Sequence, residues 1–159
     1  MKDVTIEGLG QPVCVKTNKR IIDALLQGGK PPLMACGGKG LCATCHVFVD
    51  AEADALSPQT PRERASLAAL RGRTNASRLA CQAKVRGPVR VRRPDGRFIE
   101  AAMDVESFVG KRATDDILHP VDGRLLIERG KLITRSRIVQ LKTVDVDVGE
   151  LKKRCLTVV

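Results

Sequence analysis

The chain has 159 residues and a formal net charge of +10, and its 43% of hydrophobic residues suffices for one ordinary domain or for a small domain with an appendage. Aromatic residues amount to only 2%, with no Trp and no Tyr, which argues against an aromatic stacking platform for single-stranded nucleic acid. The N-terminus lacks the apolar stretch of a signal peptide, and no run reaches the roughly 18 apolar residues of a membrane span, so we expect a cytoplasmic protein without membrane contacts.

The first thirty residues predict a β-hairpin followed by a helix. Residues 4–9 and 13–17 alternate apolar and polar side chains, as strands do, and residues 10–12 between them have the composition of a turn. Asn18 is the expected N-cap of a helix with apolar residues on one side, and Gly28 is expected to end it.

The next segment predicts a long loop over residues 30–45, which two prolines open, and then a buried strand at 47–49. A capping box at 60–63, with proline at the first helical position, predicts a helix that runs to about residue 70. Two further strands are predicted at 79–85 and 89–91.

Residues 95–159 form a predicted C-terminal extension. Its apolar pattern predicts strands at 117–118 and 125–127, a helix at 134–141 with Thr134 as its cap, a strand at 144–148, a helical turn at 150–155 and a last strand at 156–159. A segment of this size has too little core to stand alone, so we expect it to pack on the preceding domain or on a second copy. We therefore interpret it as a docking or dimerisation module.

Six cysteines carry the chemistry of the sequence, at positions 14, 36, 42, 45, 81 and 155. Three of them form the motif Cys36-x5-Cys42-x2-Cys45, and Cys81 follows 35 intervening residues later. Clustered cysteines in a reducing compartment typically bind metal rather than form disulfides. Four thiolates, two on each iron, are what a 2Fe-2S cluster requires, and the three glycines inside the motif accept the positive φ that a loop around a compact inorganic core needs.

Two other kinds of cysteine site stay open as alternatives. Structural zinc sites usually present their ligands as two close pairs in sequence, and here the second pair is missing. A redox thiol switch needs only two cysteines, fewer than this motif contains.

The Cys-x5-Cys-x2-Cys spacing, the pair Cys45-His46 and the segment Arg78-Leu79-Ala80-Cys81-Gln82 resemble the adrenodoxin-like branch of the 2Fe-2S ferredoxins. The resemblance covers about residues 3–93. It implies an α+β fold, with a β-grasp ferredoxin domain over residues 1–94 and a small mixed α/β appendage over residues 95–159.

The same resemblance implies a metal site and an activity. Cys36 and Cys42 would hold one iron, which would lie nearer the surface, and Cys45 and Cys81 would hold the other. The protein would pass single electrons between a reductase and a terminal acceptor. No nucleophile or general base stands beside a partner in the sequence, so we expect an electron-transfer protein and not an enzyme. The alternative is a regulatory iron-sulfur protein whose cluster senses redox state while its tail binds a partner.

Several other side chains were candidates for a role. Cys14, between two valines of a predicted strand, is expected to be buried, and Cys155 is expected to be a free or buried thiol, or to form an intermolecular disulfide. His46 either orders the cluster loop, as the resemblance implies, or is a surface imidazole. His119 is expected to be structural, and Lys39 either offsets cluster charge or is solvated.

Positive charge is concentrated in one part of the chain. Residues 51–100 contain eleven basic and five acidic side chains, whereas the resembling proteins dock their partners through an acidic helix after the cluster loop. We therefore expect redox partners with acidic docking surfaces, because opposite charge steers association. A merely solvated face is the alternative, and nucleic acid is disfavoured because no binding motif accompanies the charge. A homodimer through the extension is a further expectation.

Overall fold

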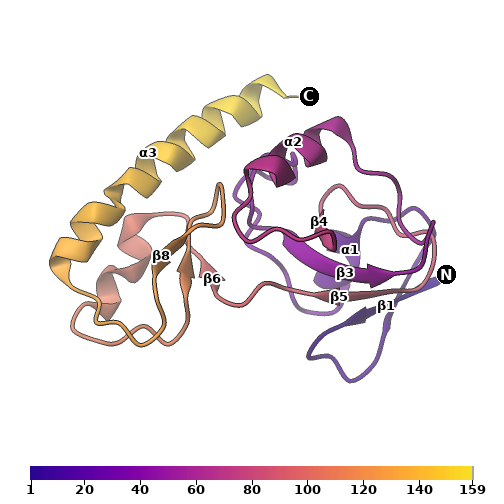
Figure 1. Ribbon diagram of the computed structural model, residues 1–159, viewed down its shortest axis with the longest axis horizontal. Helices are drawn as coiled ribbons and strands as arrows, with labels where there is room; N and C mark the ends of the chain where they lie inside the picture. The colour runs from indigo at the N-terminus through magenta and orange to yellow at the C-terminus, as the bar shows by residue number, and fades with distance from the viewer. Residues whose placement is uncertain (159) are drawn as a thin grey trace.

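The computed structural model describes residues 1–158, which form two sheets with helices packed beside them (Figure 1). Residues 1–94, here called the body, contain a five-stranded sheet of order β2-β1-β5-β3-β4. Its strands are β1 (Lys2–Ile6), β2 (Val13–Val15), β3 (His46–Ala51), β4 (Ser77–Leu79) and β5 (Val89–Arg92). β1 pairs with β5 in parallel, and the other neighbours are antiparallel, so β1 and β2 form the predicted hairpin.

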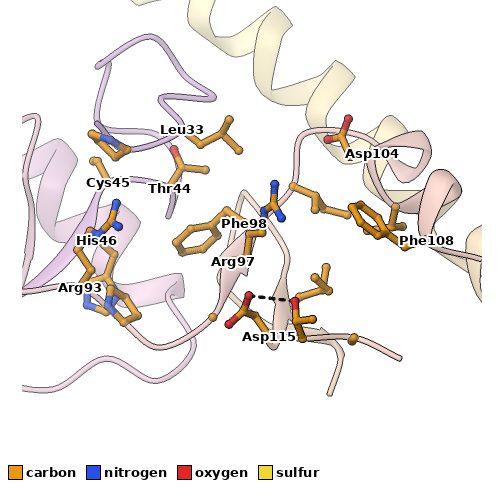
Figure 2. Close-up of a pocket in the computed structure, with 18 of the residues that line it drawn as sticks. Leu33, Thr44, Cys45, His46, Arg93, Arg97, Phe98, Asp104, Phe108 and Asp115 are labelled. Carbon is orange, nitrogen blue, oxygen red and sulfur yellow. Dashed lines mark hydrogen bonds between the residues drawn. The ribbon is translucent and has the colours of Figure 1, made fainter. Parts of the chain in front are cut away.

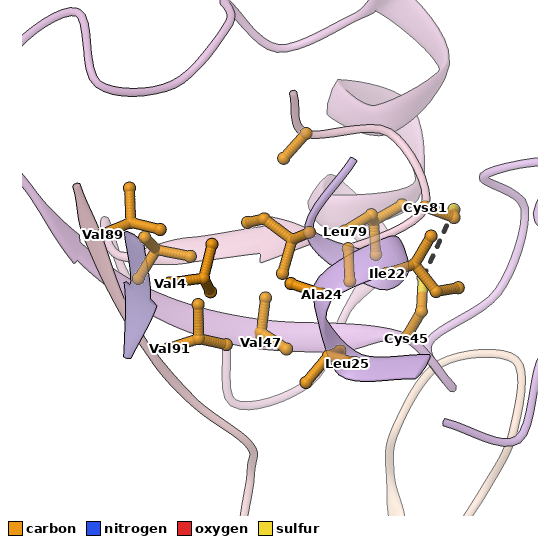
Figure 3. Close-up of a cluster of buried hydrophobic side chains, with 14 of the residues drawn as sticks. Val4, Ile22, Ala24, Leu25, Cys45, Val47, Leu79, Cys81, Val89 and Val91 are labelled. Carbon is orange, nitrogen blue, oxygen red and sulfur yellow. Dashed lines mark hydrogen bonds between the residues drawn. The ribbon is translucent and has the colours of Figure 1, made fainter. Parts of the chain in front are cut away.

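Helix α1 (Ile21–Gln27) packs on this sheet and closes the main core (Figure 3). Alternation along the strands explains the packing: in β5, Val89 and Val91 are buried while the arginines between and after them are exposed. Ile22 and Leu25 of α1 are fully buried against the valines of the sheet. Full burial of each such side chain stabilises the fold by about 1.5–3 kcal/mol.

The predicted N-cap of α1 is wrong by two residues. Arg20 is the N-cap, and its backbone N–H donates to Oδ2 of Asp23 (3.0 Å). Asn18 instead adopts a φ of 69° in the preceding turn, a left-handed conformation that Asn tolerates better than most residues. The predicted end at Gly28 is confirmed.

Helix α2 (Pro61–Ala69) begins where the capping box predicts, because Oγ1 of Thr60 accepts the backbone N–H of Glu63 (3.0 Å). The predicted strand at 79–85 is wrong for most of its length. β4 ends at Leu79 and the chain turns through Cys81, and residues 84 and 85 take part only in isolated bridges.

Residues 95–158, here called the extension, contain a second sheet of order β6-β7-β8, a 3-10 helix and a long α-helix. The elements are β6 (Arg97–Phe98), η1 (Ala102–Phe108), β7 (Ile117–Leu118), β8 (Leu125–Ile127) and α3 (Arg135–Thr157). The predicted strands at 117–118 and 125–127 and the predicted cap at Thr134, which accepts the N–H of Arg137 (3.2 Å), are confirmed.

The predicted strand at 144–148 and the predicted strand that begins at 156 are wrong, because α3 is continuous over 23 residues and includes the predicted helical turn at 150–155. Its buried residues recur three or four positions apart, which is the period of a helix: Ile138, Leu141, Val144, Val148 and Leu151. The end of the predicted last strand, residue 159, lies outside the described residues. No helix within residues 1–158 combines the length and the apolar character needed to cross a bilayer.

Candidate metal centre

The four cysteines of the motif come together where the loop before β3 meets the turn after β4. All four are buried, with exposed fractions of 4%, 2%, 3% and 2% for Cys36, Cys42, Cys45 and Cys81. The Sγ atoms of Cys45 and Cys81 lie 3.4 Å apart (Figure 3). Cys36 and Cys42 form a second pair, in which each thiol shifts the pKa of the other.

The two pairs do not merge into one group. Over the residues that the structure describes, no three His, Cys, Asp or Glu side chains converge on a point as the ligands of one metal ion would. A tetrahedral zinc site needs four donors around one centre, whereas a binuclear cluster needs two donors on each iron. Four cysteine thiols, two for each iron, are the donor set that such a cluster requires.

Each pair contains one thiol that ionises more readily than its partner. Hydrogen bonding by Cys42 lowers the pKa of Cys36 to about 5, and backbone N–H groups of residues 39–41 act in the same direction. The same bond and burial raise the pKa of Cys42. In the second pair, hydrogen bonding between Cys45 and Cys81 raises the pKa of Cys45 and lowers that of Cys81. Metal ligands must be thiolates, so Cys36 and Cys81 are the two thiols of the site that are most readily deprotonated for metal binding.

The backbone of the loop requires glycine, as predicted. Gly37, Gly38 and Gly40 have φ values of 64°, 81° and 75°. At Gly40 a Cβ would also come within 2.9 Å of Cδ of Gln82. The side chain of Gln82 donates to the carbonyl of Gly38 (3.3 Å) and to Sγ of Cys81 (3.6 Å), so it joins the loop to the fourth cysteine.

Thr44 and His46 also order the loop, and only His46 was predicted to do so. Oγ1 of Thr44 accepts the N–H of Ala35 (3.1 Å) and lies 3.1 Å from Sγ of Cys42. The imidazole of His46 is buried, with Nε2 2.8 Å from Oγ of Ser77, so the alternative of a surface imidazole is wrong. Burial, with a contribution from the charge of Arg92, lowers the pKa of His46 to about 4 and keeps the ring neutral at pH 7.

A buried ion pair fixes the approach to Cys81. Glu63 of α2 is fully buried, and its carboxylate accepts from Nε of Arg78 (2.8 Å) and from the N–H of Leu79 (2.9 Å). The pair joins α2 to β4 at Arg78, three residues before Cys81. The sequence signal for the ion pair is ambiguous, because the capping box already accounts for Glu63 and the family resemblance already accounts for Arg78.

The two remaining cysteines differ from each other. Cys14 is exposed on β2, and its Sγ donates to Oδ1 of Asp3 (3.0 Å), so the prediction of a buried side chain is wrong. The alternation of the strand turns Val15 inward and Cys14 outward. Cys155 of α3 is half-buried, and its Sγ donates to the carbonyl of Cys36 (3.6 Å).

The exposure of the cysteines does not distinguish the two pairs, so the expectation that the iron held by Cys36 and Cys42 lies nearer the surface stays a prediction. Cys36 and Cys42 are as buried as Cys45 and Cys81, because the extension covers them: Leu151 of α3 shares an apolar cluster with both. His119 is structural, as expected, since its buried ring bonds Oδ2 of Asp147 through Nε2 (2.8 Å).

A cavity of about 770 Å³ lies on another side of the same junction, beside Cys45 and His46 (Figure 2). Leu33 contributes to it from the body, and Phe98 and Phe108 contribute from the extension. The body and the extension are therefore separated by open space here.

Comparisons with known proteins indicate the family of the domain and its cofactor. A family model described as the 2Fe-2S iron-sulfur cluster binding domain matches residues 4–86. The chain is 37% identical over 79 residues to rhodocoxin of Rhodococcus erythropolis, which covers 48% of this chain and 74% of that protein. It is 41% identical over 63 residues to ferredoxin CarAc of a Sphingomonas species, or 39% of this chain and 58% of that one.

Among solved structures, the chain resembles the ISC-like [2Fe-2S] ferredoxin FdxB from Pseudomonas putida, with a TM-score of 0.54 and 28% identity over 59% of this chain and 93% of that one. The predicted α+β fold of the β-grasp type and the predicted 2Fe-2S cofactor are thereby confirmed. The chain belongs to the family of 2Fe-2S iron-sulfur cluster binding domains, and it is a ferredoxin-type electron carrier.

Proposed function

We propose that this protein passes single electrons between a reductase and a terminal acceptor, with Cys36, Cys42, Cys45 and Cys81 as the ligands of its cluster. The observation that carries the proposal is the arrangement of these four buried thiols as two pairs around a loop of left-handed glycines. Two thiolates for each iron is the ligand set of a 2Fe-2S cluster.

When bound, the cluster supplies reversible one-electron chemistry. The chain's own groups hold the sulfurs in place and stabilise their charge. Backbone N–H groups of residues 39–41 are directed at Cys36, and the side-chain amide of Gln82 donates to Cys81. Such donors favour the more negative, reduced state and so tune the reduction potential.

The partners of this carrier are proposed to present acidic surfaces. Arg64 lies exposed on α2, and Arg71 and Arg73 are exposed just after it, so one part of the body carries positive charge. Arg62 is half-buried, and its guanidinium donates to the carbonyl of Lys39 in the cluster loop (3.2 Å). This basic surface therefore adjoins the loop that contains three of the proposed ligands.

We propose a domain boundary near residue 94, with residues 95–159 as a docking module. The packing of Leu151 against the cluster loop supports this role. A homodimer through the extension is the alternative, and it has its own observation in favour: Val139 and Val146 of α3, one heptad apart, are 63% and 66% exposed. Light scattering at two protein concentrations distinguishes a monomer from such a dimer.

The second candidate function is a redox sensor whose tail binds a partner. The hydrogen bond from Cys155 to the carbonyl of Cys36 favours this function, because it connects α3 directly to a proposed cluster ligand. A change in the oxidation state of the cluster could therefore alter the position of α3. Fast electron exchange with a ferredoxin reductase supports the carrier. Slow exchange, together with a partner affinity that changes on oxidation, would support the sensor.

A cytoplasmic location is part of the proposal. The thiols of Cys14 and Cys155 are free, which suits a reducing compartment. Cell fractionation with an antibody against the chain tests it.

The central experiment is reconstitution with iron and sulfide under anaerobic conditions. We expect a coloured protein whose reduced form gives an electron paramagnetic resonance signal of a 2Fe-2S centre. Cys81→Ser should lose or alter that signal, whereas Cys14→Ser, at an exposed cysteine of β2, should leave it unchanged. A colourless, silent wild-type protein would refute the proposed function, and an unaltered signal in Cys81→Ser would refute the ligand assignment.

A further inference from the structure

We propose that α3, which lies outside the residues matched by the family, is an integral wall of the cluster site. Its last turns cover the loop of Cys36 and Cys42, exclude water from it and so set the exposure of the metal centre. The proposal rests on the ligand assignment given above, and the experiments below separate the failure of one from the failure of the other.

The first observation is an apolar seal over the loop. Leu151 of α3 is only 1% exposed, and it packs in one cluster with Cys36, Leu41 and Cys42. Partly buried apolar residues complete the cluster, and they come from both sides of the contact: Ala35, Val121, Cys155 and Val158. A dry contact of this kind keeps water and small solutes away from the sulfurs.

The second observation is a set of polar contacts between the cluster loop and the end of α3, which fix the position of the helix over the loop. Nζ of Lys39 donates to the carbonyl of Val158 (3.1 Å), and Sγ of Cys155 donates to the carbonyl of Cys36 (3.6 Å). These two contacts join the two ends of one loop segment, residues 36–39, to the last turn of α3 and the residue after it. Both contacts lie in partly buried surroundings, so they favour one placement of the helix end on the loop.

The third observation is that a turn of the extension supports the same loop from a second direction. The backbone N–H of Ala43 donates to the carbonyl of Pro120 (2.9 Å), and that of Arg71 donates to the carbonyl of Asp122 (2.8 Å). Gly123 adds to this contact, since a Cβ there would lie 3.2 Å from Cδ1 of Leu70. The turn therefore fits closely against both the cluster loop and the end of α2.

The turn and α3 form one unit. Nε2 of the buried His119 bonds Oδ2 of Asp147 on α3 (2.8 Å), and Nδ1 accepts the N–H of Val121 (3.1 Å). Arg124 bridges the carboxylates of Asp122 (2.9 Å) and Asp147 (3.4 Å). Displacement of the helix would break this network, so the cover is held in place rather than loosely associated.

The contrast along the junction shows that the cover is selective. Beside Cys45 and His46 the body and the extension enclose a cavity of about 770 Å³, with Leu33 and Phe108 on its walls left 37% and 41% exposed (Figure 2). Over Cys36 and Cys42 the same two parts meet without exposing either cysteine by more than 4%. The extension is thus fitted tightly where it meets the loop and loosely elsewhere.

Shielding has two physical consequences. Reduction adds a negative charge to the site, and water stabilises that charge, so exclusion of water lowers the reduction potential. Exclusion also slows chelators and oxidants, which must reach the irons through solvent. Both effects should disappear together when the seal is opened.

The experiment compares Leu151→Glu with Leu156→Glu in the reconstituted full chain. The two leucines lie on the same helix and receive the same change, but they are 1% and 87% exposed. Leu151→Ala is the milder variant, in case the buried charge prevents folding. The measurements are the anaerobic bleaching rate with an iron chelator, the reduction potential by spectroelectrochemistry, and amide hydrogen exchange of residues 36–43.

For Leu151→Ala we expect bleaching about tenfold faster or more, since loss of a buried leucine promotes local opening of the seal. The potential should shift upward, and exchange of residues 36–43 should accelerate. Leu156→Glu should match the wild type in all three measurements. Unchanged bleaching, potential and exchange in folded Leu151→Ala would overturn the proposal, whereas an unaltered cluster signal in Cys81→Ser would refute the ligand assignment instead.

Discussion

The guanidinium of Arg78 and the carboxylate of Glu63 form an ion pair in the interior, with Nε 2.8 Å from Oε1 and Glu63 fully buried. Glu63 lies in the first turn of α2, and Arg78 lies in β4, three residues before Cys81. A second bond, from Nη2 of Arg78 to Oε2 (3.1 Å), makes the pair bidentate. The position of the fourth cysteine thus depends on a contact with α2, since Glu63 lies eighteen residues before Cys81 in the sequence.

Arg78→Ala should strongly destabilise the protein, because it leaves the buried carboxylate of Glu63 without its cation. Breaking such a pair on one side costs about 3–5 kcal/mol. The measurement is the midpoint concentration of guanidinium chloride at which the reconstituted protein unfolds. The visible absorption of the cluster reports the unfolding. Arg73→Ala, at an exposed arginine of the same basic region, is the control and should change the midpoint little. Equal midpoints for Arg78→Ala and wild type would contradict the structural role assigned to the pair.

Gly40→Ala should disrupt the cluster loop more than Gly37→Ala does. Both glycines have positive φ, 75° and 64°, so each substitution carries the left-handed strain of roughly 1–2 kcal/mol. Only at Gly40 would the new Cβ also meet the side chain of Gln82, at 2.9 Å, whereas nothing lies within 4 Å at Gly37. The half-life of the reconstituted cluster at a fixed temperature measures the difference. If Gly37→Ala shortened it as much as Gly40→Ala, the contact with Gln82 would not matter.

The cysteine quartet and its glycines could be predicted because the ligand chemistry restricts both residue type and spacing. A loop that wraps a cluster needs thiolates at fixed intervals and glycine where φ is positive, and both requirements are visible in the sequence. The start of α2 was predictable for a similar reason, since the bond from Glu63 to Thr60 is local.

The continuity of α3 could not be predicted, because two periods coincide in its middle. Val144 and Val148 are four residues apart, and this separation suits one face of a strand as well as one face of a helix. Val146 between them is 66% exposed, which only the helical period explains. Asp145 accepts the N–H of Ala102 (2.9 Å), and Asp147 bonds the ring of His119 (2.8 Å). Both partners are distant in sequence, so no local pattern reveals them.

The packing of the extension over the cluster loop could not be predicted from the sequence either. Much of it depends on backbone groups, such as the N–H of Ala43 and the carbonyl of Pro120, and these carry no residue-specific signal. The apolar residue at its centre, Leu151, is indistinguishable in sequence from the exposed Leu156. Only the relative placement of the body and the extension assigns them different environments.

Charge reversal next to α2 should weaken association with an acidic partner. Changing Arg64, Arg71 and Arg73 to Glu replaces an attractive field by a repulsive one, and steering of this kind alters association rates by about tenfold or more at low salt. The measurement is the second-order rate of reduction by a ferredoxin reductase at several ionic strengths. The control applies the same charge change to three exposed cations of the extension: Arg129, Lys131 and Arg137.

The arginine variant should be slow at low salt and should approach the wild-type rate as salt increases, since screening removes both fields. The extension variant should retain the wild-type salt dependence. If both variants behaved alike, net charge rather than this surface would govern the reaction.

Cys14 should react slowly with iodoacetamide at neutral pH although it is exposed. Its hydrogen bond to Asp3 and the negative charge of that carboxylate raise the pKa of the thiol, so little thiolate is present. Asp3→Asn removes the charge and should shift the pH profile of alkylation toward lower pH, with faster reaction at pH 8. Asp23→Asn, at a carboxylate that bonds Arg20 instead, is the control and should leave the profile of Cys14 in place. Mass spectrometry of the peptide that contains Cys14 gives the rate for this thiol alone, and an unchanged profile in Asp3→Asn would show that the carboxylate does not control its reactivity.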